Sequence, residues 1–311
     1  MKKWLLDLVP GVRSLQQERD DLAQLSEQLS ARLARAEESL RLATAAKRSP
    51  AEPPAGARTY HFKGYDIPVD LMELTGGGPA TFDIISKGHI DNLQRWIGLE
   101  PTHTVLEIGC GIGRDAIPLT EILTNGRYVG VDIVKRSIDW CTDNIARRHP
   151  NFGFYHYDVQ DQLHNPGGTI KTTDVQIPLP DKSVDRIVLF SVFTHMFQPD
   201  IEHYLREFNR LLKPSGLVYA TTFLFDDKIL QKARETNLTP FDLRFEHEVN
   251  PNCRINTPSH PLGAVAYTVA AWDQMIAATG MRYAKPFLHG AWSGFYADPQ
   301  DGQDVAILAT A

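Results

Sequence analysis

Cysteine is scarce in this chain of 311 residues. Cys110, Cys141 and Cys253 lie far apart, and none of them belongs to a CxxC pair or to a set with metal-ligand spacing. Aspartate and histidine show no such set either, so the sequence gives no reason to expect a dithiol redox motif or a metal site. An odd, sparse set of cysteines is typical of a reducing compartment, which predicts a cytoplasmic location.

Long apolar runs and a strong charge excess are absent as well. No stretch approaches the roughly eighteen apolar residues that a membrane-spanning helix needs. Lysine and arginine number 32 against 38 acidic residues, and the formal charge of -6 gives no general attraction to nucleic acid or anionic lipid. We therefore expect no nucleic-acid partner.

The first residues, MKKWLLDLVPG, combine two lysines with a short apolar patch. Asp7 interrupts the patch and no small-residue cleavage site follows, so we do not expect a secretory signal. Trp4, Leu5, Leu8 and Val9 could instead bind weakly at the inner face of a membrane, or they could contact a partner protein. The sequence leaves these two alternatives open.

Residues 13–48 contain no glycine or proline and are rich in good helix formers. Their apolar residues recur at steps of three and four and form one stripe on a long helix: Leu22, Leu25, Leu29, Leu33, Ala36 and Leu40. A lone helix does not bury such a stripe, which favours a coiled coil and a homo-oligomer, although the polar residues Glu18, Arg32 and Ser39 fall on its seam. A helix packed on its own domain is the alternative.

The segment SPAEPPAGA, residues 49–57, is a proline- and alanine-rich linker between the N-terminal segment, residues 1–48, and a domain of residues 58–311. In this domain strand-like and helix-like segments alternate. Strands are expected at 102–109, 126–133, 152–159, 184–193, 217–225 and 302–311, and helices at 114–123, 135–149, 200–216 and 269–281. The alternation predicts an α/β fold with a doubly wound, mostly parallel sheet.

The segment VLEIGCGIGRDA, residues 105–116, forms the turn between the first of these strands and the first of these helices. Ligands of doubly wound sheets bind at the carboxyl ends of the strands. Gly109, Gly111 and Gly113 would let the backbone approach a ligand closely and adopt dihedral angles that larger residues avoid. Taken alone, the pattern fits NAD, FAD or a plain turn.

Two acidic residues narrow the choice of ligand. Asp132 ends the next strand, 23 positions after Gly109, where a carboxylate can accept hydrogen bonds from two ribose hydroxyls. Arg114 stands where the dinucleotide pattern G-x-G-x-x-G has its third glycine. Glu107 would repel a pyrophosphate and suits a ligand with a positive charge; alternatively, it holds the turn by accepting backbone N–H bonds.

These segments together resemble the class I S-adenosylmethionine-dependent methyltransferases. VLEIGCGIGR matches their first motif, VGVDI the second and FYHYDVQD the third, and two later matches are IPLPDKSVDRIVLFSVFTHM and YLREFNRLLKPSGLVYATTF. The resemblance covers roughly residues 75–225. It implies a Rossmann-like, seven-stranded sheet with S-adenosyl-L-methionine as the cofactor.

The resemblance also implies a set of cofactor-binding residues. Asp132 would bind the ribose and Asp158 the adenine amino group, although Asp158 could instead only cap the following turn. The full set is Glu107, Gly109, Cys110, Gly111, Gly113, Asp132, Ile133, Asp158, Val159 and Ser191. Cys110 is expected to be a small filler side chain rather than a reactive thiol.

His195 follows the fourth strand in SVFTHM, where the transferable methyl group would point. Transfer to an alcohol requires removal of the hydroxyl proton, and a neutral imidazole suits this task near pH 7. We therefore predict that His195 is a catalytic base or orients the substrate; packing in the core or capping a helix is the alternative. Thr194 stands where many relatives have a glutamate, which argues against the cyclopropane-forming relatives. His89, His260 and His289 are rivals for the base.

The front segment LTGGGPATFDIISKGHIDNL and the tail HGAWSGFYADPQDGQDVAILA resemble a narrower group of methyltransferases, associated with bacterial surface-polysaccharide and glycolipid assembly. We expect the substrate wall to come from residues 75–90, the insertion at 162–176 and residues 245–267. Aromatic faces with amide and imidazole groups suit a sugar, although aromatic residues near the end of a sheet are often core residues. The predicted substrate residues are His89, Asn256, His260, Tyr267, His289 and Trp292.

Together, these observations predict an enzyme that methylates a sugar hydroxyl of a bacterial glycan or glycolipid by in-line displacement, without a metal. Methylation of nitrogen or carbon in a small natural product is one alternative. A non-catalytic scaffold with a vestigial cofactor pocket is another, but the intact glycines, Asp132 and Asp158 count against it.

Deletion of residues 1–56 is expected to leave a folded domain that still binds the cofactor, because the proline-rich linker separates two folding units. If residues 13–48 form a coiled coil, the truncated protein is a smaller assembly than the full chain in light scattering. A full-length protein that is already monomeric would contradict the coiled coil.

Overall fold

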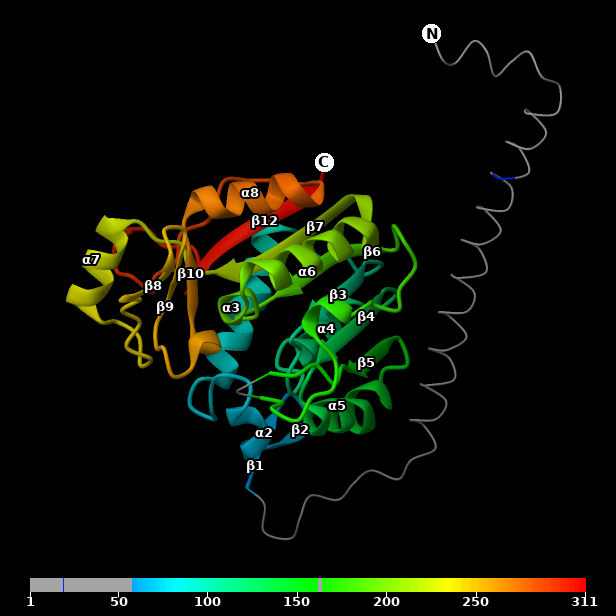
Figure 1. Ribbon diagram of the computed structural model, residues 1–311. Helices are drawn as coiled ribbons and strands as arrows, with labels where there is room; N and C mark the ends of the chain where they lie inside the picture. The colour runs from blue at the N-terminus through cyan, green and yellow to red at the C-terminus, as the bar shows by residue number, and fades with distance from the viewer. Residues whose placement is uncertain (1–18, 20–57, 162–163) are drawn as a thin grey trace, which may run out of the picture.

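The computed structural model describes residues 58–161 and 164–311, together with the helical residue Arg19 (Figure 1). The rest of the predicted N-terminal helix and the linker lie outside the described residues. In the described part, no helix is long and apolar enough to span a membrane.

A seven-stranded sheet forms the centre of the described domain, in the order β11-β12-β7-β6-β3-β4-β5. Strands β5, β4, β3, β6 and β7 run parallel, whereas β12 is antiparallel to both β7 and β11. The predicted doubly wound, mostly parallel sheet is therefore confirmed. The strands are β3 (Thr104–Ile108), β4 (Arg127–Asp132), β5 (Phe152–His156), β6 (Val184–Leu189), β7 (Leu212–Thr222), β11 (Met281–Tyr283) and β12 (Asp304–Thr310).

Helices cover both faces of this sheet, because its central strands are apolar on both sides. On one face α6 and α8 pack against the sheet, with Trp272 fully buried between them and the strands. On the other face apolar residues of α3, α4 and α5 form one core cluster with the buried Tyr128 of β4. The helices are α2 (Val69–Glu73), α3 (Phe82–Trp96), α4 (Ala116–Ile122), α5 (Lys135–Cys141), α6 (Gln198–Leu211), α7 (Asp227–Thr236) and α8 (Val269–Thr279).

Several short elements complete the described structure. The hairpin of β1 (Thr59–Phe62) and β2 (Tyr65–Pro68) packs near α5, where the Tyr65 ring meets that of Trp140. Strands β8 (His247–Asn250), β9 (Cys253–Ile255) and β10 (Val265–Tyr267) form a small antiparallel sheet that lies with α7 at one end of the main sheet (Figure 1). Single helical turns are Thr142–Ala146, Thr172–Asp174, Phe193–His195 and Pro261–Gly263.

The helix predicted at 200–216 is shorter at its C-terminal end than the sequence indicates. It ends at Leu211, and β7 begins with the next residue, Leu212, which pairs with Val184. A register shift between Val184 and Arg186 then accommodates the Lys-Pro-Ser-Gly segment inside the strand. The proline and glycine that were expected to end the helix therefore lie in an irregular part of the strand.

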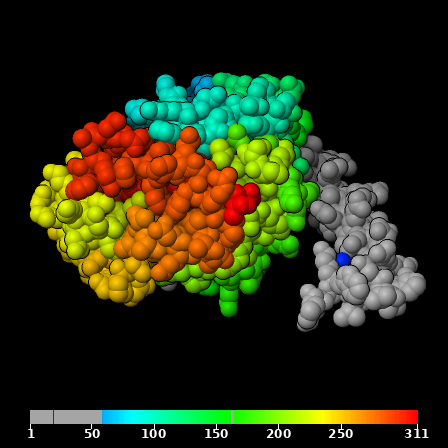
Figure 2. Space-filling view, turned by 90° about the horizontal axis from the view of Figure 1, so that it is seen from above, coloured from blue at the N-terminus to red at the C-terminus, as the bar shows by residue number. Residues whose placement is uncertain are grey.

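Residues 284–303 connect β11 to β12 and cross the molecule between α3 and the lobe of α7 and β8–β10 (Figure 2). Asp304 begins β12 and is fully buried. Its carboxylate accepts the backbone N–H groups of Leu224 and Gly290, both at 2.9 Å, and the indole N–H of Trp292 at 2.7 Å. One side chain therefore joins the end of β7 to the crossing segment.

Replacement Asp304→Ala is expected to lower the free energy of unfolding by about 3 kcal/mol or more, because three buried donors lose their acceptor. Urea denaturation followed by circular dichroism measures this change. Asp298→Ala removes an exposed carboxylate from the same segment and is expected to change the stability by no more than about 0.5 kcal/mol. Equal effects of the two replacements would contradict the role of Asp304.

Candidate active site

The glycine-rich turn between β3 and α4 adopts a conformation that requires glycine. Gly109, Gly111 and Gly113 have φ angles of +77°, +51° and +78°, in the left-handed region that residues with a Cβ atom rarely adopt. A Cβ atom at Gly109 would lie 2.5 Å from a methyl carbon of Val192, and one at Gly111 would lie 2.5 Å from Thr75. The turn is therefore closely packed between the end of β6 and the front segment.

Asp132 ties this turn to the end of β4. One carboxylate oxygen accepts the N–H of Gly111 at 2.7 Å, and the other accepts the N–H of Val134 at 2.7 Å. Only 9% of Asp132 is exposed, and burial raises its pKa although these backbone bonds oppose the shift. Each oxygen keeps a second lone pair, so the carboxylate can still accept hydrogen bonds from hydroxyl groups.

Glu107 lies beneath the turn and is buried. It accepts a short hydrogen bond from the hydroxyl of Tyr128 rather than from backbone N–H groups, so the prediction that it holds the turn through such bonds is wrong. Burial, and next the nearby charge of Asp115, raise the pKa of Glu107 well above its usual range. Its surroundings therefore favour the neutral form of Glu107.

His89 reaches the glycine turn from α3. Its Nδ1 lies 2.7 Å from Asp115 Oδ2, and its ring stacks on Phe190 at a centroid distance of 3.6 Å. The other oxygen of Asp115 and Nε of Arg114 are buried, lie 4.0 Å apart and have no hydrogen-bond partner among the described residues. The two opposite charges therefore form a loose buried ion pair next to the turn.

Asp158 follows β5 and binds side chains of the insertion. Its two oxygens accept hydrogen bonds from Asn165 Nδ2 at 3.0 Å and from the Thr169 hydroxyl at 2.7 Å, and these bonds lower its pKa. The carbonyl of Val159 accepts a second bond from Asn165 at 3.0 Å. Asp158 thus organises the turn that follows it, and its contact with adenine stays a prediction.

The remaining predicted cofactor residues lie around the same strand ends. Cys110 is buried, and burial raises the pKa of its thiol well above the usual range, as expected of a filler side chain. The carbonyl of Ile133 accepts a bond from His156 Nε2 at 3.1 Å. Ser191 is exposed, has a φ of +58° and donates its hydroxyl to Gln303 at 3.2 Å.

His195 ends a single helical turn directly after β6. Its Nδ1 lies 2.8 Å from the carbonyl oxygen of Leu262, and its ring centroid lies 6.5 Å from that of His164 in the insertion. The bond to Asp161 raises the pKa of His164, and the charge of Asp132 adds to this effect. These contacts place His195 between the loop of Leu262 and the insertion that follows β5.

Three predicted substrate residues have structural roles instead, which corrects the prediction. Tyr267 and Trp292 are only 1% and 4% exposed, so neither ring presents a face to a ligand. Their polar atoms bond inside the protein, to Met196 O at 3.1 Å and to Asp304 at 2.7 Å. The amide of Asn256 accepts two backbone N–H bonds and donates to a carbonyl, which holds the loop before β8.

The other two predicted substrate histidines lie apart from each other. His260 is exposed and contacts the hydroxyl of Ser259 at 3.1 Å. His289 stacks on Tyr296 and lines a cavity near the start of α8. The structure therefore brings His89 to the glycine turn and His195 to the end of β6, while His260 lies two residues before Leu262, whose carbonyl contacts His195, and His289 lines the cavity near the start of α8.

Part of the described domain is similar to a known protein family. Residues 106–220 match the family described as a methyltransferase domain. This range begins in β3, contains the glycine turn and ends in β7. These residues therefore form a methyltransferase domain.

The names of the relatives of this methyltransferase domain indicate different substrates. The sterol 24-C-methyltransferase of Neurospora crassa is 26% identical over 179 residues, which are 54% of this chain and 42% of that protein. The phthiotriol/phenolphthiotriol dimycocerosates methyltransferase 1 of Mycobacterium ulcerans is 27% identical over 193 residues, or 60% of each chain. Among solved structures, the methyltransferase CalO1 of calicheamicin biosynthesis has a TM-score of 0.48 and 13% identity, with 73% of this chain and 54% of that chain covered. The chain thus spans less than half the length of the sterol enzyme.

The residues around the glycine turn fit S-adenosyl-L-methionine, the cofactor of this methyltransferase domain. Its ribose hydroxyls and adenine amino group donate hydrogen bonds, and Asp132 and Asp158 offer carboxylate acceptors at the ends of two neighbouring strands. Its amino-acid part carries a positive and a negative charge, and the ion pair of Arg114 and Asp115 places both signs of charge beside the turn.

Sequence reasoning missed several residues of this region. Arg114 and Asp115 directly follow the last glycine of the turn. Two charged side chains at this position could have been predicted from the sequence as site residues. Thr75 and His164 gave no such signal, because they come from a front segment and an insertion whose path over the strand ends depends on tertiary contacts.

Replacement Asp132→Ala is expected to weaken binding of S-adenosyl-L-methionine by at least ~2 kcal/mol in calorimetry, since charge-assisted bonds to the ribose are lost. Gly111→Val is expected to do more damage, because its Cβ would collide with Thr75. Asp139→Ala, which removes an exposed ion pair with Lys135, is the matched control. Unchanged affinity of a folded Asp132→Ala protein would remove Asp132 from the cofactor site.

Proposed function

We propose that this chain methylates a hydroxyl group of a sugar in a bacterial glycan or glycolipid, with S-adenosyl-L-methionine as the methyl donor. The observation that carries the proposal is the arrangement of His195, a partly buried imidazole that is fixed through one nitrogen directly after β6. Transfer to a hydroxyl oxygen needs a base that removes the proton, and such an imidazole supplies one.

The contact with Leu262 determines which nitrogen of His195 is available. A carbonyl oxygen only accepts hydrogen bonds, so Nδ1 carries the proton in this 2.8 Å contact. In the neutral imidazole, Nε2 then has the lone pair. The backbone therefore holds His195 in the tautomer that a general base requires.

The surroundings keep His195 neutral. Burial is the largest influence and lowers its pKa, and the charge of His164 lowers it further, against the opposite effect of the bond to Leu262. Asp161 lies 3.3 Å from His164 and raises the pKa of that histidine. His164 therefore holds a proton in preference to His195.

When bound, the cofactor supplies a methyl group on a positively charged sulfur atom. Nε2 of His195 would accept the proton of the acceptor hydroxyl while the hydroxyl oxygen bonds the methyl carbon, and the carbon–sulfur bond would break with its electron pair left on sulfur. The chain contributes further by holding the reacting oxygen and carbon in line at about 3 Å.

Replacement His195→Asn is expected to lower turnover by ~100-fold or more and to leave cofactor affinity nearly unchanged. Asparagine keeps an N–H donor for Leu262 and removes the Nε2 lone pair. The wild-type rate is expected to rise with pH through an apparent pKa below the usual value of ~6.5, because His195 acts when neutral and burial lowers its pKa. The variant loses this rise. Initial rates on methyl glycosides across the range in which histidine titrates measure both effects.

His203→Gln is the control, because His203 also bonds a backbone carbonyl, that of Val175 at 2.7 Å, but lies within α6. It is expected to keep the rate and the pH profile. A large loss of rate in His195→Asn with the pH rise intact would make His195 an orienting residue. Near-normal turnover would contradict the base and direct attention to His89.

A further inference from the structure

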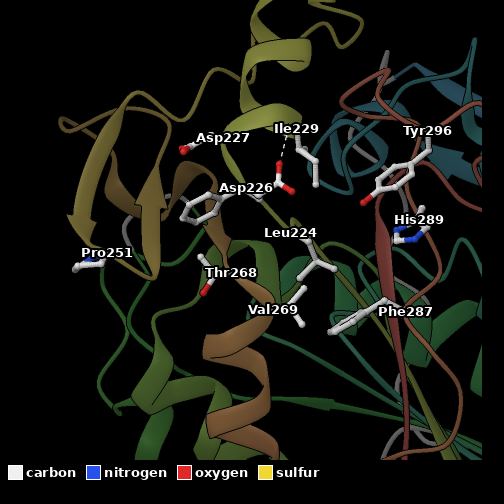
Figure 3. A pocket seen from close by; sticks show the side chains of 11 residues that line it. Leu224, Asp226, Asp227, Ile229, Pro251, Thr268, Val269, Phe287, His289 and Tyr296 are labelled. Atoms are coloured by element: carbon white, nitrogen blue, oxygen red, sulfur yellow. Dashed lines mark hydrogen bonds between the residues drawn. The ribbon is translucent and has the colours of Figure 1, made fainter.

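A cavity of about 500 Å³ lies between the start of α7, the start of α8 and the segment 284–303 (Figure 3). We call it the α7/α8 cavity. Leu224, Ile229, Val269 and Phe287 give it an apolar surface, and polar side chains line the rest. Its volume and mixed lining are typical of sites for small molecules.

One polar wall consists of His289 and Tyr296. Their rings stack at a centroid distance of 3.7 Å with 10° between the planes. The backbone N–H and carbonyl of His289 both bond Gln300, at 2.9 and 2.8 Å, which fixes the residue in place. Nδ1 of His289 is buried and has no hydrogen-bond partner among the described residues. The stack and the backbone bonds therefore fix the His289 ring at the cavity wall, and no described residue uses its Nδ1.

Asp226 provides the facing polar group. One of its oxygens accepts the N–H of Ile229 at 2.8 Å and so caps α7. No cation among the described residues forms an ion pair with Asp226. Burial, and next the charges of Asp304 and Asp226, raise the pKa of Tyr296, so the phenol and this carboxylate lie within electrostatic range. Figure 3 shows the Tyr296 hydroxyl pointing into the cavity, towards the side where Asp226 lies.

The cavity lies next to the proposed site of methyl transfer. The N–H of Ser191, just after β6, donates to the Thr221 hydroxyl near the end of the paired strand β7 at 2.7 Å. Leu224 follows Thr221 by three residues, which span at most about 11 Å. Asp304 bonds Leu224 and Gly290, so it joins the floor of the cavity to the segment that carries His289. The cavity is therefore joined to the end of β6, which precedes His195, by a short hydrogen-bonded path.

We propose that the α7/α8 cavity binds a pyranose ring of the acceptor next to the sugar that is methylated. The inference rests on the proposed function, because it concerns the same acceptor. The apolar surface takes the C–H face of the ring, and Asp226, His289 and Tyr296 take its hydroxyl groups. A hydroxyl both donates and accepts, so it can satisfy a carboxylate, a phenol and an imidazole nitrogen together. An ammonium group cannot accept, and an anion would be repelled by Asp226.

The test measures binding of methyl glucoside, methyl mannoside and methyl rhamnoside to the full chain. Binding is detected by ligand-observed saturation-transfer NMR in the presence of S-adenosylhomocysteine. The wild type is expected to bind at least one of them. Asp226→Asn keeps a residue that caps a helix well and removes the charge. Val269→Trp fills the cavity from a half-exposed position, so it should not disturb the core. Each variant is expected to weaken sugar binding at least tenfold.

Asp298→Asn makes the same charge change at an exposed residue of the segment 284–303 and is expected to bind like the wild type. If no glycoside binds, or if both cavity variants bind as tightly as the wild type, the inference is overturned. Displacement of the sugar by ethylammonium would also overturn it in favour of an amine site. If the wild type methylates a sugar and both cavity variants methylate it equally well, the inference is overturned but the proposed function is not. Sugar binding that the variants abolish, without any methylation by the wild type, would support the sugar site and contradict the proposed function.

Discussion

The cofactor half of this domain depends on the carboxylate of Asp132. It accepts one N–H from the glycine turn after β3 and one from the turn after β4, both at 2.7 Å. A buried carboxylate is tolerated because it has these bonds. The neighbouring acid Glu107 accepts a bond from Tyr128 but none from the turn, and burial raises its pKa well above the usual range. The residue expected to bind the ribose therefore also gives the turn its shape.

The region that we propose to bind the acceptor depends on a second buried carboxylate. Asp304 joins the end of β7 to the segment 284–303, which in turn bonds Ser191 through Gln303. The proposed base and the α7/α8 cavity are thus attached to the same two strand ends. This arrangement explains how a lobe built from short strands can present a site at a defined place beside a rigid sheet.

The central sheet and the glycine turn could be predicted from the sequence because their signals are local. Apolar runs alternate with helical periodicity, and left-handed backbone at Gly109 requires a residue without a side chain. The small sheet gave no comparable signal. All four residues of β8 are exposed, so it has no alternating pattern, and β9 and β10 have only three residues each. Tyr267 and Trp292 were expected at a sugar surface, but composition cannot tell a stacking ring from a core ring.

The most direct test of the account is to identify the product of methyl transfer. The full chain is incubated with S-adenosylmethionine that carries a deuterated methyl group and with a set of bacterial oligosaccharides, and the products are analysed by mass spectrometry and NMR. The account predicts a deuterated methyl group on a sugar hydroxyl oxygen. A label found only on nitrogen or carbon of another acceptor, with every sugar unlabelled, would contradict it.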